Sequence, residues 1–284
     1  MYRLGSSERV DLPLAVVIGA GAMGMAVARR LAQQHRVLLA DINAPLVEER
    51  VAAMRSEGCD ASSIVCDVTS VASVQTLAAT VGEKGGLAAL AHVAGLSPSL
   101  GDFRSIMRVN LRGAALVADA LLPLTRQGSA AVLIASLAAH NFTPVAEVLE
   151  ILRDPTSEDL VERLQSAVGQ ERATPQIAYA YSKWAMLSLV RRSATAWGER
   201  GARIMSLSPG LIATTQGALE FQKSEGKQRL FQLSPMCREG TMLEIADAVE
   251  FLLSPRASFI SGSDLLVDGG LCAAVSQKQA SLTL

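Results

Sequence analysis

The sequence predicts an α/β fold of the Rossmann type, in which a doubly wound parallel sheet forms a single domain. Short runs of Val, Ile, Leu and Ala alternate with longer amphipathic segments, as expected for right-handed βαβ units. Half of the residues are hydrophobic and only 4% are aromatic, which favours a parallel sheet buried between helices. A glycine-rich turn follows the first apolar run, where a strand must turn sharply into a helix.

Four strands are expected in the first half of the chain, each a short β-branched or aliphatic run. They are predicted at residues 14–18, 37–40, 64–66 and 87–93. Amphipathic periodicity predicts the helices between and after them. These lie at 23–34, at 45–56, after residue 66, and at 103–126 as one long helix or two in tandem. Thr69 and Ser70 are both candidate N-caps for the helix after residue 66.

The second half of the chain continues the same alternation. Its strands are predicted at 130–135, 202–207 and 265–267, and its helices at 177–199 and 242–253. Gly269 and Gly270 close the last strand, so the core is expected to span residues 13–270. Neither a repeat nor a linker indicates a second domain.

One stretch interrupts the alternation, a polar and helix-prone insert over residues 141–176. Helices are predicted over 145–153 and 157–169, with Ser157 as the N-cap of the second. The insert is too short to form a domain. We therefore expect it to lie on the core as a flap or an interface element.

Composition excludes several classes of protein. The net charge of −1 gives no basic surface for nucleic acid or an anionic membrane. Apolar runs fall short of the roughly 18 residues that span a bilayer, and the first residues lack the apolar region of a signal peptide. The spacing of Cys59, Cys66, Cys237 and Cys272 fits neither a metal site nor a redox motif. A soluble, cytoplasmic protein with reduced thiols and no metal is expected.

The glycine-rich turn has the pattern G-x-G-x-x-G, formed by Gly19, Gly21 and Gly24. The first glycine permits the tight turn, the second allows the backbone to approach a diphosphate, and the third lets the helix pack against the strand. The diphosphate would lie at the helix N-terminus, where the backbone amides are free. The pattern therefore predicts a dinucleotide site.

Two aspartates bear on the choice of dinucleotide. Asp41 ends the second strand, where a carboxylate can accept hydrogen bonds from the ribose hydroxyls of NAD and would repel the 2′-phosphate of NADP. The turn from Gly19 to Met25 contains no Arg or Lys to bind that phosphate. NAD is therefore predicted. Asp67 follows the third strand and either reaches the adenine amino group or serves only as a turn residue.

A second constellation predicts chemistry at the carboxyl edge of the sheet. Tyr179 and Lys183 are four residues apart in a helical segment and therefore share one helix face. Ser136 follows the fifth strand, and Ser208-Pro209-Gly210 ends the sixth. A lysine ammonium favours the phenolate of a nearby tyrosine, and a serine hydroxyl can hold a substrate oxygen against it. Ketone reduction needs a hydride on carbon and a proton on oxygen, and these groups suit the transfer of that proton to or from the substrate oxygen. Tyr181 competes for the tyrosine role but faces elsewhere, so a role in packing or in an oligomer contact is expected for it.

Together these residues resemble the short-chain dehydrogenase/reductase family over about residues 13–270. The resemblance implies a catalytic tetrad of Asn110, Ser136, Tyr179 and Lys183, with Asn110 kinking its helix and supporting a water-borne proton relay to the lysine. It implies that Thr214 binds the nicotinamide carboxamide. The implied cofactor-binding residues are Gly19, Gly21, Met23, Gly24, Asp41, Asp67, Val68, Ala94, Gly95, Tyr179, Lys183, Pro209, Gly210, Ile212 and Thr214.

Three departures from the family pattern stand out. The glycine turn is one residue shorter than usual and is preceded by Ile18 in place of a threonine. His92-Val93-Ala94-Gly95 replaces the usual N-N-A-G, and His92 is expected to be structural. The insert separates Ser136 from Tyr179 by more than the usual distance. It resembles the extension of the bacterial 3α-hydroxysteroid dehydrogenase/carbonyl reductase branch, which suggests steroid-like or other bulky apolar substrates.

A substrate lid is expected over residues 211–240. Its apolar residues either line a pocket or pack the lid onto the body; they are Phe221, Leu230, Phe231, Leu233 and Met236. The resemblance also implies a homodimer or homotetramer. Because the insert follows Ser136 closely, we expect it to modify or block one family interface and to favour a dimer.

Three other functions compete with alcohol oxidation and ketone reduction. A non-catalytic NAD-binding regulator would need the glycine turn but not the tetrad. Sugar-nucleotide epimerases are longer and space their glycines differently. Enoyl reduction would need a tyrosine seven residues before Lys183, where this chain has Gln176. An NAD(H)-dependent oxidoreductase is therefore the predicted function.

Overall fold

The protein is described here from a computed structural model, in which residues 12–140, 142–213 and 225–282 are described. Seven strands form one parallel sheet in the order β3-β2-β1-β4-β5-β6-β7. They are β1 (Leu14–Ile18), β2 (Arg36–Asp41), β3 (Ala61–Val65), β4 (Leu87–His92), β5 (Thr125–Ile134), β6 (Arg203–Pro209) and β7 (Asp264–Val267). The strand order reverses between β1 and β4, which is the point where such sheets bind ligands beyond their carboxyl ends. The predicted doubly wound sheet is confirmed.

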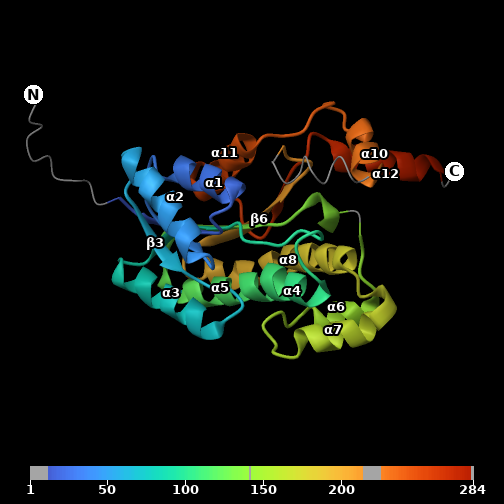
Figure 1. Cartoon of the computed structure of the whole chain (residues 1–284), viewed down its shortest axis with the longest axis horizontal. Coiled ribbons are helices and arrows are strands. Elements are labelled where there is room, and N and C mark those ends of the chain that lie inside the picture. Colours follow the sequence, from blue (N-terminus) through green and yellow to red (C-terminus); the bar gives the residue numbers. More distant parts are fainter. Residues whose placement is uncertain (1–11, 141, 214–224, 283–284) are drawn as a thin grey trace, which may run out of the picture.

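Helices cover both faces of the sheet (Figure 1). One face packs against α1 (Ala22–Leu31), α2 (Ala44–Ser56) and α11 (Met242–Leu253). The other packs against α3 (Val71–Glu83), α5 (Ala114–Leu121) and α8 (Pro175–Gly198). Because side chains alternate along a strand, neighbours such as Val16 and Val17 enter opposite core clusters. Ser70, rather than Thr69, caps α3 by accepting a hydrogen bond from the amide of Ser73.

The segment predicted as helix over 103–126 is divided into four parts. These are α4 (Phe103–Met107), the π-helix η1 (Arg108–Gly113), α5, and the 3-10 turn η2 (Leu122–Leu124). β5 then begins at Thr125, so the predicted helix extends too far and the predicted strand starts too late. Pro123 has no amide hydrogen to continue the helix. Gly128, with φ of +86°, lies where the register against β4 shifts.

The insert forms a third layer outside the α4 and α8 helices (Figure 1). Its helices are α6 (Ala146–Ile151) and α7 (Leu160–Val168), followed by the 3-10 turn η4 (Gln170–Arg172). A separate apolar cluster joins α6 and α7 to α4 and α8. The predicted capping role of Ser157 is wrong. Asp159 precedes α7 without a side-chain capping bond, and the Ser157 hydroxyl donates to the Asp159 carboxylate instead.

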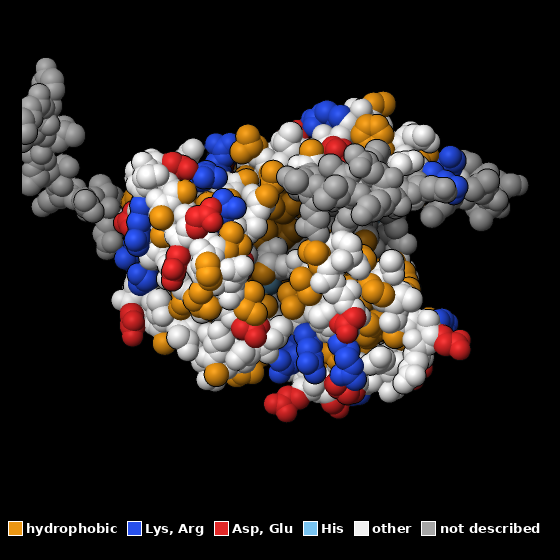
Figure 2. All heavy atoms as spheres, viewed as in Figure 1, with side chains coloured by type: hydrophobic (Ala, Val, Ile, Leu, Met, Phe, Trp, Pro, Cys, Tyr) orange, Lys and Arg blue, Asp and Glu red, His pale blue; other side chains and the backbone are white. Residues whose placement is uncertain are grey.

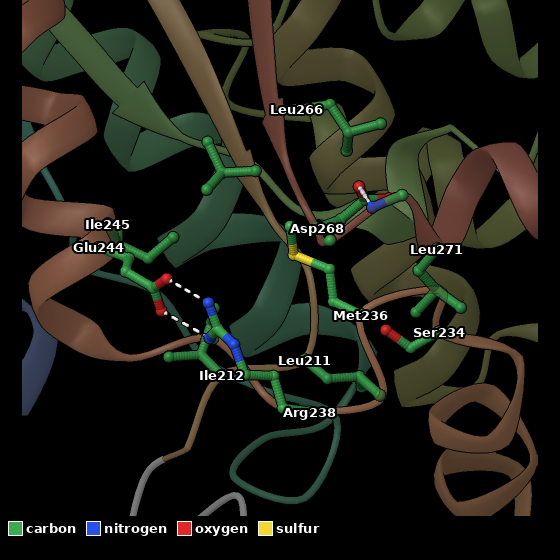
Figure 3. Close-up of a pocket in the computed structure, with 14 residues that line it drawn as sticks. Leu211, Ile212, Ser234, Met236, Arg238, Glu244, Ile245, Leu266, Asp268 and Leu271 are labelled. Atoms are coloured by element: carbon green, nitrogen blue, oxygen red, sulfur yellow. Dashed lines mark hydrogen bonds and ion pairs between the residues drawn. The ribbon is translucent and has the colours of Figure 1, made fainter.

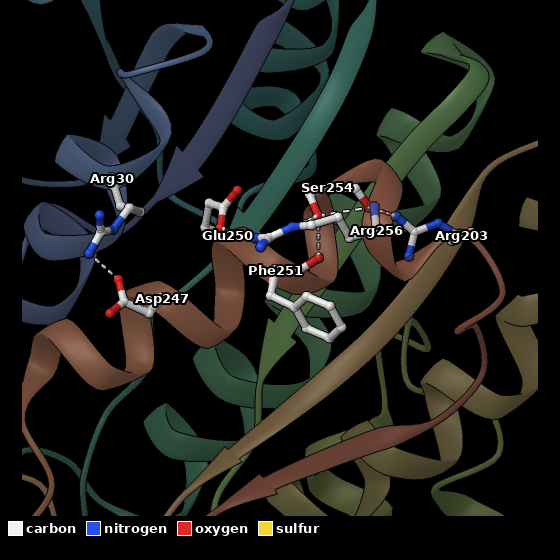
Figure 4. Close-up of polar contacts among 7 residues, drawn as sticks. All are labelled: Arg30, Arg203, Asp247, Glu250, Phe251, Ser254 and Arg256. Atoms are coloured by element: carbon white, nitrogen blue, oxygen red, sulfur yellow. Dashed lines mark hydrogen bonds and ion pairs between the residues drawn. The ribbon is translucent and has the colours of Figure 1, made fainter.

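A buried arginine fastens α11 to the sheet. The Arg203 guanidinium donates to the carbonyls of Leu252 at 2.9 Å, Ser254 at 3.1 Å and Ile260 at 3.2 Å. It thereby satisfies carbonyls at and just beyond the end of α11 that have no partner within the helix. Figure 4 shows Arg203 beside the end of α11, where Arg256 also pairs with Glu250.

Two helices were not predicted, α10 (Glu225–Leu233) within the lid and α12 (Leu271–Leu282) after the last strand. The strand β3 also lies earlier than predicted and excludes Cys66. It is an edge strand with only one neighbour, so its polar residues Ser62 and Ser63 do not prevent pairing. Among the described residues, no helix is both long and apolar enough to cross a membrane.

Candidate active site

The predicted site residues gather beyond the carboxyl ends of the central strands. Gly19 follows β1, Asp41 ends β2, Gly95 follows β4, Ser136 follows β5, and Pro209 ends β6. In the space-filling view the molecule is hollowed between the α1 side and the α4 side, and hydrophobic side chains line the hollow (Figure 2). Thr214, the predicted carboxamide ligand, lies outside the described residues.

The glycine turn has the geometry that its sequence pattern predicts. Gly19 has φ of +104°, and a Cβ there would lie 2.8 Å from the amide nitrogen of Ala94. A Cβ on Gly24 would lie 1.8 Å from the carbonyl oxygen of Gly19, so the helix could not pack against the strand. A Cβ on Gly21 would meet no atom of the described protein within 4 Å. Gly21 therefore offers open space beside the first-turn amides, including that of Met23, which lack acceptors within the helix.

Asp41 orders this turn. Its Oδ2 accepts from the Ala20 amide at 2.7 Å, and its Oδ1 accepts from the Asn43 amide at 2.9 Å. Each carboxylate oxygen has a second lone pair, so the carboxylate can also accept from hydroxyls. Asp67 makes the local contacts of a turn residue. Its Oδ1 accepts from the amide and the hydroxyl of Thr69, at 2.9 and 2.8 Å.

Tyr179 and Lys183 lie in the first half of α8. The hydroxyl of Thr174 caps this helix and Pro175 begins it, two residues earlier than predicted. Lys183 is only 4% exposed. Its Nζ donates to the Ile134 carbonyl at 2.7 Å and lies 5.7 Å from the centroid of the Tyr179 ring. Burial lowers the pKa of Lys183 to about 8, because desolvation penalises the ammonium.

Asn110 lies in the π-helix η1, which is the distortion that the family resemblance implies. Its Oδ1 accepts from the Leu96 amide at 2.7 Å, and its Nδ2 donates to the Leu96 carbonyl at 2.9 Å and to Ser182 Oγ at 3.5 Å. A Cβ on Gly95 would lie 3.3 Å from Asn110 Oδ1 and 3.5 Å from Lys183 Nζ. The loop after β4 therefore meets the buried side chains of Asn110 and Lys183 at Gly95, which is itself exposed.

Ser136 begins the 3-10 turn η3 (Leu137–Ala139). Its Oγ accepts a hydrogen bond from the amide of Ala138 at 3.2 Å. Because a hydroxyl has one proton and two lone pairs, this contact uses a lone pair and leaves the proton for another acceptor. Ser136 can therefore donate to a substrate oxygen.

Two further residues have the structural roles predicted for them. His92 is buried beside Lys183, and burial, with a smaller effect of the lysine charge, lowers the pKa of His92 to about 4. The imidazole is therefore neutral near pH 7. Tyr181 packs edge-on against Phe142, with ring centroids 4.9 Å apart, and burial raises the pKa of its phenol.

One polar cluster next to the site was not predicted from the sequence. His140 Nε2 lies 2.9 Å from Asp264 Oδ2 and 3.2 Å from Ser208 Oγ. Ser208 was singled out only for its place before Pro209-Gly210. The position of His140, four residues after Ser136, was the available signal.

A cavity of about 310 Å³ opens beside the segment that follows Pro209-Gly210 (Figure 3). It lies between the ends of β6 and β7, the start of α11 and the lid segment at 234–240. Arg238 pairs with Glu244 across its wall, with Nη2 2.6 Å from Oε1. Of the apolar lid residues named from the sequence, Met236 lines this cavity, and Phe221 lies outside the described residues.

Comparison with known proteins shows extensive similarity. A family model described as enoyl-(acyl carrier protein) reductase matches residues 19–153 and 163–272. A short-chain dehydrogenase/reductase of Alternaria brassicicola, bsc3, is 34% identical over 94% of this chain and 98% of its own length. The 3-alpha-hydroxysteroid dehydrogenase/carbonyl reductase of Comamonas testosteroni is 33% identical over 68% of this chain and 76% of its own length.

The fold is also shared with solved structures. The crystal structure of gox2181 has a TM-score of 0.74 at 26% sequence identity. The match covers 93% of this chain and 97% of that one. The likeness thus extends through the sheet and both helical layers.

Proposed function

Because the chain belongs to the short-chain dehydrogenase/reductase family and is an oxidoreductase acting on CH–OH groups, we propose that it interconverts a secondary alcohol and a ketone with NAD(H). The observation that supports this most strongly is the position of Lys183. Its ammonium is buried at the sheet edge and lies 5.7 Å from the centre of the Tyr179 ring. Burying an ammonium is costly, and stabilising the phenolate form of the neighbouring tyrosine would account for its position here.

Each member of the site has a defined task in the proposed reaction. Tyr179 gives a proton to the substrate oxygen in reduction and takes it back in oxidation. Lys183 stabilises the phenolate by its charge, and the Ser136 hydroxyl donates to the same substrate oxygen. Asn110 holds the loop after β4 in place beside Lys183. The bound nicotinamide dinucleotide supplies or accepts the hydride.

We assign NAD rather than NADP as the cofactor on the basis of Asp41. A carboxylate at the end of β2 can accept from ribose hydroxyls and would repel a 2′-phosphate. The segment from Gly19 to Met25 has no Arg or Lys to offset that repulsion. The two cofactors should be compared at equal substrate concentration. A tenfold preference for NADPH would refute the assignment.

The substrate we propose is a hydroxysteroid or another bulky apolar alcohol or ketone. Similarity to the Comamonas testosteroni enzyme supports this class, as does the resemblance of the insert before α8 to the extension of that branch. A panel of secondary alcohols, steroids included, should be screened with NAD⁺ by absorbance of the reduced nicotinamide. Turnover confined to small polyols would overturn the substrate class and leave the reaction type intact.

Two other functions are tested by the same assay. The description of the family model favours enoyl reduction, but Gln176 occupies the position where that chemistry would need a tyrosine. NADH consumption with an α,β-unsaturated thioester and not with ketones would favour it. NADH binding without turnover of any compound would instead indicate a non-catalytic, NAD(H)-binding regulatory protein.

We also propose that the protein is a cytoplasmic homodimer. The insert covers the outer side of α4 and α8, so these helices are not available to a second subunit there. Light scattering on the intact protein and on a variant lacking the insert tests this. A tetramer in both would overturn the role of the insert, and cell fractionation tests the location.

A further inference from the structure

The cluster of His140, Ser208 and Asp264, here called the imidazole tie, has a defined hydrogen-bonding pattern. A carboxylate only accepts hydrogen bonds, and Asp264 Oδ2 lies 2.9 Å from His140 Nε2. Nε2 must therefore carry a hydrogen that points at the carboxylate. Ser208 Oγ, at 3.2 Å from the same nitrogen, lies within reach as a second acceptor.

The imidazole tie joins three segments that are distant in the sequence. His140 ends the η3 turn that Ser136 begins. Ser208 lies in β6 immediately before Pro209-Gly210, the predicted cofactor loop. Asp264 begins the edge strand β7 and pairs in register with Ser206 of β6. One side chain thus connects the η3 turn to the strand that leads into the cofactor loop.

Two of the three side chains are buried, whereas that of His140 is 28% exposed. The side chain of Asp264 is 8% exposed and Ser208 is fully buried. Among the described residues, Asp264 Oδ1 and the hydroxyl of the adjacent Ser206 have no hydrogen-bond partner. The Asp264 carboxylate is therefore stabilised mainly through Oδ2, and losing His140 would leave a buried charge with little compensation.

The turn from Ser136 to His140, here called the serine turn, is short, so the position of His140 largely determines the position of Ser136. Backbone bonds run from the Ala139 amide to the Ser136 carbonyl at 3.0 Å and from the His140 amide to the Leu137 carbonyl at 3.1 Å. The Ala138 amide donates to Ser136 Oγ, which directs the serine proton away from the turn. Fixing His140 therefore fixes the direction in which Ser136 can donate.

We propose that His140 is a positioning residue, which holds the Ser136 turn against β6 so that the serine hydroxyl faces the substrate oxygen beside the cofactor loop. The proposal rests on the proposed function, since it assigns His140 an effect on turnover through Ser136. It does not make the cluster a hydrolytic triad. Such a triad places the serine and the carboxylate on different imidazole nitrogens, whereas both contact Nε2 here.

A double-mutant cycle separates this role from a general structural one. His140→Ala and Ser136→Ala should be made singly and together, and kcat/KM should be measured with a ketone that the wild type reduces. We expect His140→Ala to lower kcat/KM about tenfold, because small misplacements of catalytic groups are costly. In the Ser136→Ala background, His140→Ala should lower kcat/KM by less than about twofold. The Kd for NADH should change less than kcat/KM in all variants, because the glycine turn and Asp41 make no contact with the imidazole tie among the described residues.

Conservative and matched variants complete the test. His140→Gln places an amide nitrogen near the position of Nε2 and should restore most of the activity. Asp264→Asn keeps an acceptor of nearly the same shape and should lower kcat/KM by only about threefold. This variant tests the proposal if His140→Ala does not fold. His35→Ala is the control, because His35 precedes the amino end of β2, opposite the site, and its Nδ1 lies 3.2 Å from the Leu31 carbonyl oxygen. This variant should retain full turnover.

Two results would overturn the proposal. One is equal activity of His140→Ala and the wild type. The other is an equal fold-loss in the presence and absence of Ser136, which would show that His140 acts through general stability. If the wild type turns over no alcohol or ketone, the proposed function fails, and the His140 proposal fails with it. If the wild type is active and one of the two results above is found, only the His140 proposal fails.

Discussion

The two faces of the sheet are built from alternate residues of the same strands, yet their chemistry differs. Toward α11 the strands present an aliphatic core, with Val17, Leu39, Val132 and Leu207 all buried. Toward α8 the same strands are aliphatic at one end and become polar near their carboxyl ends. The buried polar residues on that side include His92, Ser206 and Ser208 from the strands and Asn110, Ser182 and Lys183 from the helices.

This difference separates stability from function within one sheet. An aliphatic face stabilises the fold through burial and packing. A buried polar face is costly unless its groups are paired, and two of its groups have no partner among the described residues, the His92 ring and the Ser206 hydroxyl. We therefore expect substitutions on the α8 face to change activity more than stability, and substitutions on the α11 face to do the reverse.

The largest expected effect is that of Tyr179→Phe. Removing the hydroxyl removes the proposed acid and base, so kcat should fall by about 10³-fold or more, within the range of general acid–base catalysis combined with alignment. NADH binding, followed by quenching of protein fluorescence, should be retained. Activity close to that of the wild type would show that the α8 face is not the catalytic one.

Tyr181→Phe is the matched control. Tyr181 is two residues away on the same helix and packs against Phe142. Removing its hydroxyl keeps the ring contact, so kcat should stay within about threefold of the wild type. Equal loss in both variants would contradict the assignment of Tyr179.

On the α11 face, Leu39→Ala should have the opposite outcome. Leu39 is fully buried in β2, and truncating a buried leucine costs about 2 to 5 kcal/mol of unfolding free energy. The folded fraction should keep its kcat and its KM. Urea denaturation and turnover measured on the same sample test this. A fall in kcat without a fall in stability would break the comparison between the faces.

The aliphatic face and the glycine turn could be predicted from the sequence for the same physical reason. A strand buried on both sides has a continuous apolar composition. The G-x-G-x-x-G pattern marks a backbone geometry that only glycine fits at positions 19 and 24. The pairing of Tyr179 with Lys183 follows from helix periodicity. In each case the interaction is local in sequence, so a window of residues contains the information.

What could not be predicted depends on distant contacts. Asp264 is 124 residues from His140, and no local pattern links them. The polar residues 62–63 of β3, which lie before the predicted strand at 64–66, pair with β2, and the Oδ1 atom of Asp67 accepts from Thr69. The end of the helix before β5 depends on Pro123 and on a register shift near Gly128, which sequence periodicity does not reveal.

Lys183 gives a prediction for the polar face that depends on pH. Burial lowers its pKa from 10.5 to about 8. Below about pH 8 the folded and unfolded chains both carry the charge, so the cost of burying it is present in full. As the pH rises from about 8 toward 10.5, the folded chain loses its proton first, the unfolded chain binds more protons, and stability rises.

The measurement compares the wild type with Lys183→Met. Between pH 7.5 and 10 the unfolding free energy of the wild type should rise by about 2 to 3 kcal/mol relative to the variant. Urea midpoints at the two pH values give this difference. Lys183→Met should also be inactive at both. A difference that does not change with pH would mean that the ammonium is not desolvated in the folded protein.

The smallest expected effect concerns Arg203, a charged residue on the structural face. Arg203→Met removes the donors to the carbonyls of Leu252, Ser254 and Ile260, which costs about 1 to 3 kcal/mol for unpaired buried groups. Part of this loss is offset, since the variant no longer buries a charge. Arg256→Ala, at a side chain that is 65% exposed, should cost less than about 1 kcal/mol. Because Arg203 lies at the end of β6 opposite the site, kcat should be unchanged in both variants. A loss of turnover in Arg203→Met at full folding would mean that the α11 face also serves catalysis.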